Sequence, residues 1–217
     1  MSLSAIEVTD ATVSMADAVG TSGVNLPRRL NDLDIKGSFK YAPVHYSIDL
    51  EHLSFRGDGP DLSIGQAAGR IGVRDDNVYI EQMSIATAES SLKVDGVIEQ
   101  YLKTPVMKLT ISGHASLPEI GRVIPALAEY KLHPDFEVKA NGPAERVALD
   151  LNVRSEAGNI TGQLTADLQG PAMGARGKVN VERLNLAPIL RDPSQRSDIT
   201  GQAQLDLNVG ATPAAAN

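Results

Sequence analysis

The stretch from Ala144 to Pro171, A-E-R-V-A-L-D-L-N-V-R-S-E-A-G-N-I-T-G-Q-L-T-A-D-L-Q-G-P, decides the expected fold. Apolar and polar residues alternate through its two arms, residues 147–154 and 160–168. Successive side chains of a strand point to opposite faces, so this alternation predicts strands with one apolar and one polar face. Residues 155–159 between the arms predict the turn of an antiparallel hairpin.

Similar short alternating segments recur along most of the chain, at a spacing typical of an all-β protein. The segment 116–131, S-L-P-E-I-G-R-V-I-P-A-L-A-E-Y-K, breaks this rhythm. Ser116 and Glu119 have the spacing of a capping box, and the apolar residues recur at helical intervals, which predicts a helix kinked or split before Pro125. A second short turn or helix is expected over residues 184–191, and the dipeptide Asp95-Gly96 predicts a tight turn.

These patterns divide the chain into five parts. They are a poorly patterned strand and loop (1–32), a first β module (33–115), a helical insertion (116–131), a second β module (132–210) and a tail without pattern (211–217). The tail is expected to be frayed or part of a cut linker.

The composition bounds the classes of function. The 217 residues are 42% apolar but only 4% aromatic, without Trp, so aliphatic side chains must form most of the core. A net charge of -7, with Arg28-Arg29 as the one tight basic pair, argues against nucleic-acid binding. The absence of Cys excludes disulfides and thiol catalysis. No apolar run is long enough to predict a membrane-spanning helix.

The sequence offers no pattern of catalytic or metal-binding residues. Its four histidines, His45, His52, His114 and His133, lack the spacing of metal ligands. Acidic pairs at Asp58/Asp61 and Asp75/Asp76 lack the ligand pattern of a calcium loop and are interpreted as turn residues. There is no G-x-S-x-G elbow and no candidate triad. We therefore expect a non-enzymatic protein without catalytic residues, metal or cofactor.

Four segments carry a resemblance to a known family. They are S-G-H-A-S-L-P-E-I (112–120), the G-x-L-x-x-D-L strand (162–168), G-K-V-N-V-E-R-L-N-L-A-P-I-L (177–190) and G-Q-A-Q-L-D-L (201–207). On these segments the chain, over about Val94 to Val209, resembles the AsmA and TamB superfamily of envelope proteins.

This resemblance implies a fragment of a longer periplasmic protein, attached to the inner membrane through parts absent here. It implies curved sheets that form an apolar groove and carry phospholipid between the inner and outer membranes, with phospholipid acyl chains as partners. TamB-like members also imply outer-membrane assembly proteins as partners. The competing hypothesis is a scaffold or interaction module that assists outer-membrane protein assembly by pairing its strand edges with a client strand.

Two architectures fit the alternation. One is a strongly curved, mainly antiparallel sheet, a groove or taco-like fold with one or two short helices, and the other is a closed β-sandwich. In the groove, the predicted lipid-lining residues are the apolar side chains of the hairpin that opens this subsection: Val147, Leu149, Leu151, Val153, Ile160, Leu164, Ala166 and Leu168.

Overall fold

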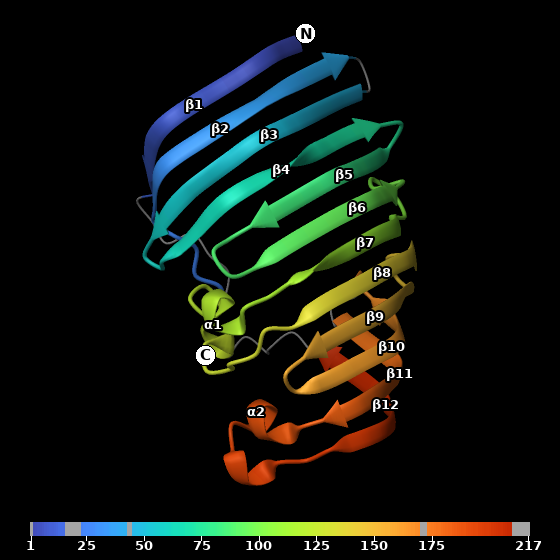
Figure 1. Ribbon diagram of the computed structural model, residues 1–217. Helices are drawn as coiled ribbons and strands as arrows, with labels where there is room; N and C mark the ends of the chain where they lie inside the picture. The colour runs from blue at the N-terminus through green and yellow to red at the C-terminus, as the bar shows by residue number, and fades with distance from the viewer. Residues whose placement is uncertain (1, 16–22, 43–44, 170–172, 210–217) are drawn as a thin grey trace, which may run out of the picture.

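A computed structural model describes residues 2–15, 23–42, 45–169 and 173–209 of the chain. Twelve strands form one antiparallel sheet in which each strand pairs with its neighbours in the sequence, from β1 to β12. Figure 1 shows this sheet as a continuous curved wall that is not closed into a barrel. The chain therefore builds a long meander.

The strands contain between nine and fourteen residues each. Their bounds are β1 Ser2–Ser14, β2 Arg29–Ala42, β3 His45–Asp58, β4 Leu62–Arg74, β5 Asn77–Ala86, β6 Ser91–Glu99, β7 Val106–His114, β8 Asp135–Pro143, β9 Val147–Ser155, β10 Gly158–Asp167, β11 Met173–Leu184 and β12 Ile199–Val209.

The prediction of an all-β protein with a strongly curved sheet and short helices is confirmed. The described strands form a single sheet, so the curved-sheet alternative holds and the two-sheet sandwich does not. The predicted modules 33–115 and 132–210 lie in this one sheet, because β7 pairs with β8 along its whole length. The predicted tail, 211–217, and residues 16–22 of the loop before β2 lie outside the described residues.

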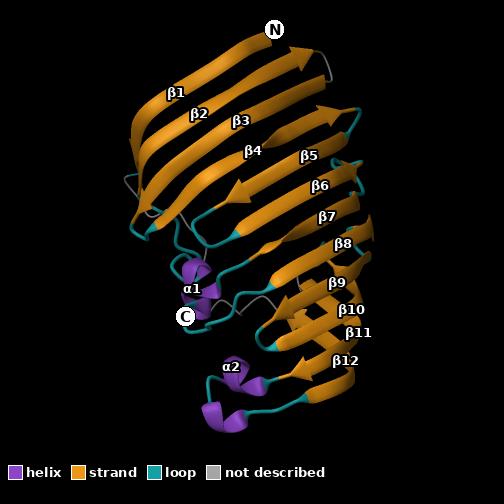
Figure 2. Cartoon of the chain, in the orientation of Figure 1, coloured by secondary structure: helices purple, strands orange, loops and turns teal. Residues whose placement is uncertain are grey.

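The helical segments interrupt the meander at two connections. Between β7 and β8, a short helix α1 (Leu117–Ile120) is followed by a 3-10 turn η1 (Pro125–Leu127), so the predicted helix is split before Pro125. Between β11 and β12, α2 (Leu186–Leu190) precedes η2 (Pro193–Gln195). Figure 2 shows these helices, in purple, on the same side of the sheet.

The tight turn predicted at Asp95-Gly96 is wrong. Strand β6 runs through both residues, and the chain turns after Glu99. Gly96 has a φ of 137°, which glycine tolerates within a strand, and the Asp95 carboxylate accepts a hydrogen bond from the backbone N–H of Gln82 on β5 (2.9 Å). The dipeptide thus shapes the sheet rather than ending a strand.

β-Bulges explain part of the curvature. The strand registers shift around Asp10, Gln82 and Arg183, and each of these residues has a positive φ. A bulge frees a backbone N–H from the ladder, and here a side chain of the adjacent strand accepts it: Asp34, Asp95 and Thr200, respectively, at 2.9 to 3.1 Å. Because a bulge bends its strand and increases the local twist, three satisfied bulges bend this sheet at fixed positions.

The connection between β7 and β8, residues 115–134 and here called the cap segment, shows how far the sheet curls. The backbone N–H of Asn25, in the β1–β2 connection, donates to the carbonyl of Val123 (2.7 Å). Arg191, in the β11–β12 connection, pairs with Glu129. These connections are ten strand positions apart, about 48 Å along the sheet at roughly 4.8 Å per strand. Val123 and Glu129 are six residues apart, a span of at most about 20 Å, so the curvature of the sheet and the reach of the two connections together bring both of them to the cap segment.

Candidate functional site

One face of the sheet is apolar across all the strands. In register, Leu109 of β7 lies opposite Ala140 of β8, which lies opposite Leu149 of β9 and then Leu164 of β10. The row beside it continues the pattern with Val94, Ile111, Val138 and Leu151 on β6 to β9. The period of two in each strand and the regular register together produce a continuous apolar surface.

This apolar face is most exposed on the first strands. Tyr41 of β2 lies opposite Tyr46 of β3, and Ile48 of β3 lies opposite Ile71 of β4. All four side chains are more than a third exposed, and Ile48 is 49% exposed. A contiguous set of exposed apolar side chains is unusual on a protein surface, which makes this set a candidate binding surface. We name these four residues the exposed patch.

The structure brings the predicted lipid-lining residues together on β9 and β10. Val153 lies opposite Ile160, Leu149 opposite Leu164, and Val147 opposite Ala166, with Leu151 facing Gly162, so the predicted hairpin is confirmed. Within this group Val147 is fully buried and Ala166 is buried, whereas Leu168 is exposed just beyond β10. The other five are half-buried. Their contact with lipid stays a prediction.

A tyrosine cluster borders the exposed patch at the end of the strands away from the cap segment. The side chain of Tyr101, in the β6–β7 loop, hydrogen-bonds that of Tyr46. The Tyr101 backbone N–H donates to the carbonyl of Asp76 in the β4–β5 turn (2.9 Å). Desolvation, followed by the neighbouring Tyr46, raises the pKa of Tyr101, so its hydroxyl stays protonated. This contact between distant loops carries no signal in the sequence pattern.

The cap segment holds a buried polar cluster at the opposite end. The carboxylate of Glu119, which is 2% exposed, accepts hydrogen bonds from Thr87 Oγ1 (2.6 Å), Ser90 Oγ (2.5 Å) and the backbone N–H of Glu89 (3.2 Å). Ser116 Oγ accepts the backbone N–H of Glu119 (3.3 Å), which is half of the predicted capping box. The Glu119 carboxylate points instead toward the β5–β6 turn, and its hydrogen bonds connect the cap segment to that turn.

The ionisation of Glu119 reflects these partners. Burial alone would raise the pKa of this carboxyl, because desolvation penalises the charged form. The hydrogen bonds from Ser90, Thr87 and Glu89, together with the charge of Arg122, outweigh burial and hold the pKa below its ordinary value of 4.5. Glu119 is therefore an ionised, buried anchor at neutral pH.

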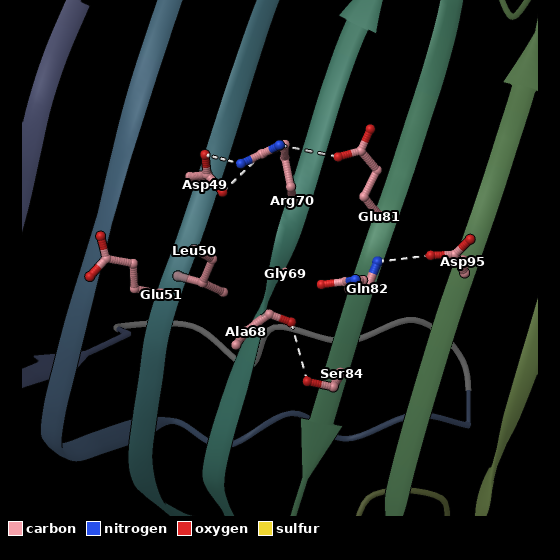
Figure 3. Close-up of a pocket in the computed structure, with 10 residues that line it drawn as sticks. All are labelled: Asp49, Leu50, Glu51, Ala68, Gly69, Arg70, Glu81, Gln82, Ser84 and Asp95. Carbon is pink, nitrogen blue, oxygen red and sulfur yellow. Dashed lines mark hydrogen bonds and ion pairs between the residues drawn. The ribbon is translucent and has the colours of Figure 1, made fainter.

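The other face of the sheet is polar. It contains an open depression of about 800 Å³. Figure 3 shows that Arg70 lies there between Asp49 and Glu81. The guanidinium contacts the two carboxylates at 2.9 and 3.3 Å. The acidic side chains in the depression outnumber Arg70, and the paired groups are half-buried (Asp49) or exposed (Arg70 and Glu81). We interpret the arrangement as cross-strand ion pairing on a solvated face.

Two of the four histidines, one at the end of β7 and one within the cap segment, lie side by side. The rings of His114 and His133 stack with centroids 6.4 Å apart. His114 Nδ1 lies 2.9 Å from Asp135, and His133 Nδ1 lies 2.8 Å from Glu156. Within the described part of the chain, no three His, Asp or Glu side chains are grouped to bind a metal ion. No helix in those same ranges has the length and apolarity to cross a bilayer.

Comparisons with known proteins place few constraints on this chain. No family model matches it, and no solved structure matches it. Part of the chain is similar to the transcription antitermination protein NusB of Lysinibacillus sphaericus, at 35% identity over 78 residues. The match covers 36% of this chain and 56% of NusB, so the chain spans little more than half of that relative.

The resemblance to AsmA and TamB proteins is wrong by these comparisons, since no family model supports it and the similarity found is to NusB. The segments quoted for it, such as G-x-L-x-x-D-L at 162–168, follow from an alternation that any strand with one apolar face shares. The expected parent protein, its inner-membrane attachment and its periplasmic location came from that resemblance and stay predictions.

Proposed function

We propose that the apolar face of this sheet binds the acyl chains of phospholipids, and that the protein is a non-enzymatic lipid-carrying segment. The observation that carries the proposal is the exposed patch on an apolar face that runs through the sheet without a second sheet packed on it in the described residues. Apolar surface of this extent is favourable only when something apolar covers it. A hydrocarbon chain fits a surface made of Ile, Leu, Val and Tyr side chains.

The free energy of binding an acyl chain to this face suits a protein that transfers lipid better than one that stores it. Each buried methylene contributes about 0.8 kcal/mol relative to water, so a sixteen-carbon chain gains on the order of 10 kcal/mol before the costs of binding. Relative to a bilayer the exchange is close to neutral, because both environments are apolar. The charged groups are on the opposite face, so apart from the hydroxyls of Tyr41 and Tyr46 an acyl chain finds few polar anchors and can slide.

The test uses residues of the exposed patch, because charges there cost the fold little. Replacing Ile48 and Ile71 with Asp places two carboxylates on the apolar face, and burying them under an acyl chain is strongly unfavourable. We expect the double variant to lose phospholipid that co-purifies with the wild-type chain, measured by native mass spectrometry.

The matched control is Ser47→Asp, which adds a carboxylate one residue away on the polar face. This variant should keep its lipid. Equal lipid content in the double variant and the wild type, with both folded by circular dichroism, would contradict the proposal.

A second candidate function is favoured by the two ends of the sheet. β1 and β12 each pair with one neighbour among the described strands, so each presents a free ladder edge of eleven residues or more. Such edges pair with extended segments of other proteins. A client peptide, rather than phospholipid, bound in the same mass spectra would favour a scaffold that assists outer-membrane protein assembly.

A further inference from the structure

We propose that the β6–β7 loop, residues 100–105, docks the protein on the surface of a zwitterionic phospholipid bilayer. The inference rests on the proposed function only in that this loop borders the face where an acyl chain would lie. Leu102 forms the loop tip and is 65% exposed, the highest value among the exposed large apolar side chains. An exposed Leu at a loop tip can insert between lipid tails.

The loop is built to hold Leu102 outward. The backbone N–H of Gln100 donates to the Asn77 side chain (3.1 Å), that of Tyr101 to the Asp76 carbonyl (2.9 Å), and that of Lys103 back to the Gln100 carbonyl (2.9 Å). Three hydrogen bonds fix a six-residue loop, so the exposure of Leu102 follows from the fold. Less ordering entropy is then lost when the loop meets a membrane.

The residues around Leu102 suit the depth of lipid headgroups. Tyr41, Tyr46 and Tyr101 lie on the same side as the loop, each with an apolar ring and a polar hydroxyl, and Tyr is enriched where a membrane meets water. Lys103 follows Leu102 and forms no ion pair with another described residue, so its ammonium group can meet a lipid phosphate. At the end with the cap segment Leu190 is also exposed, but the cation beside it, Arg191, is already paired with Glu129 and lies over the ring of Tyr130.

The charge of the chain selects the kind of bilayer. A net charge of -7 opposes approach to a strongly anionic surface. A zwitterionic surface offers phosphate groups to Lys103 without this long-range repulsion. We therefore assign phosphatidylcholine-like or phosphatidylethanolamine-like bilayers as the partner.

A single tryptophan can report the docking, because the chain has none. With vesicles of phosphatidylcholine, the fluorescence of Leu102→Trp should shift to the blue and be quenched by brominated acyl chains. The matched control is Leu190→Trp on α2, near the cap segment, where the replaced side chain is 54% exposed. It should not respond. An equal response of the two variants, or none from Leu102→Trp, would overturn the proposal.

Two further measurements define the contact. Leu102→Ala should lower the vesicle partition coefficient about tenfold, which corresponds to removing most of a buried Leu side chain. Binding to vesicles of phosphatidylglycerol that equals or exceeds binding to phosphatidylcholine would overturn the assignment to zwitterionic surfaces.

The outcome is separable from that of the proposed function. Adding Ile48→Asp and Ile71→Asp to Leu102→Trp should abolish co-purifying lipid and leave the blue shift. If Leu102→Trp shows no blue shift with vesicles but the protein still co-purifies with lipid, the proposal for the loop fails and the proposed function stands. If the protein binds vesicles but the wild type never co-purifies with lipid, the proposed function fails and the proposal for the loop stands.

Discussion

The first and second halves of the sheet share one pattern of alternation but differ in how their apolar face is covered. On β3 and β4, Ile48 and Ile71 remain in contact with solvent, whereas on β9 and β10 Val147 and Ala166 are buried. The burial at Val147 comes with the β8–β9 loop, where the Ala144 carbonyl accepts the backbone N–H of Leu168 (2.8 Å). The β8–β9 loop therefore covers the apolar face at one end of β9 and β10, whereas the same face is open at Ile48 and Ile71.

This difference teaches that periodicity identifies the apolar face of a strand but not its accessibility. Two residues with the same pattern can differ in burial, Ile48 as part of the proposed binding surface and Val147 as part of the core. Substitutions that separate these roles are ordered below from the largest expected effect to the smallest.

Val147→Asp should produce the largest loss of stability. A carboxylate at a fully buried site loses its hydration without gaining a partner, so we expect the free energy of unfolding to fall by about 4 kcal/mol. Urea denaturation followed by circular dichroism measures this loss.

Ala148→Asp is the control, since Ala148 is exposed on the polar face of the same strand. Ile48→Asp should cost less than about 1 kcal/mol, as for other surface substitutions. If Val147→Asp and Ile48→Asp proved equally destabilising, the contrast between the two halves would be lost.

Glu119→Gln tests how strongly the cap segment holds the first half of the sheet. The change removes the charge that accepts hydrogen bonds from Thr87, Ser90 and Glu89, so unfolding should become easier by about 2 kcal/mol. Glu145→Gln, at an exposed loop position, is the matched control and should have no effect. Unchanged stability in Glu119→Gln would show that this anchor is dispensable.

The pH dependence of stability in the wild type and in Glu119→Gln gives a further test. The folded-state pKa of Glu119 lies below 4.5, so ionisation of this group stabilises the folded state above the unfolded-state pKa. That stabilisation is lost as the pH falls below 4.5 through the folded-state pKa. The difference in unfolding free energy between wild type and Glu119→Gln should be constant from pH 7 to about pH 5 and shrink below pH 4.5. A difference that grew with acid would reverse the assigned direction.

Arg70→Ala should have the smallest effect. Arg70 bridges Asp49 and Glu81 on the polar face, but the side chain is half exposed, and such pairs contribute less than about 1 kcal/mol. Thermal unfolding at low and high salt measures the change, which should diminish as salt screens the charges. A loss as large as that of Glu119→Gln would mean that the polar face, too, has a structural role.

The sequence alone predicts much of the fold and less of the site. Alternation identified the hairpin of β9 and β10 and the apolar face, because these depend on a local period. The turn predicted at Asp95-Gly96 failed since a hydrogen bond to Gln82 on a neighbouring strand keeps both residues within β6. The bond between Tyr46 and Tyr101 joins residues of different hairpins. Such contacts arise from tertiary proximity, which no local pattern reports.

The sequential order of the strands has a consequence for assembly. Every strand from β2 to β11 pairs with the strands immediately before and after it, so nearly all the ladder contacts join residues close in the sequence. Folding can then start from any hairpin and propagate in both directions, as in repeat proteins, without the slow long-range searches of most β proteins. Removing or duplicating a pair of strands away from the cap segment would change the length of the wall without rerouting the chain.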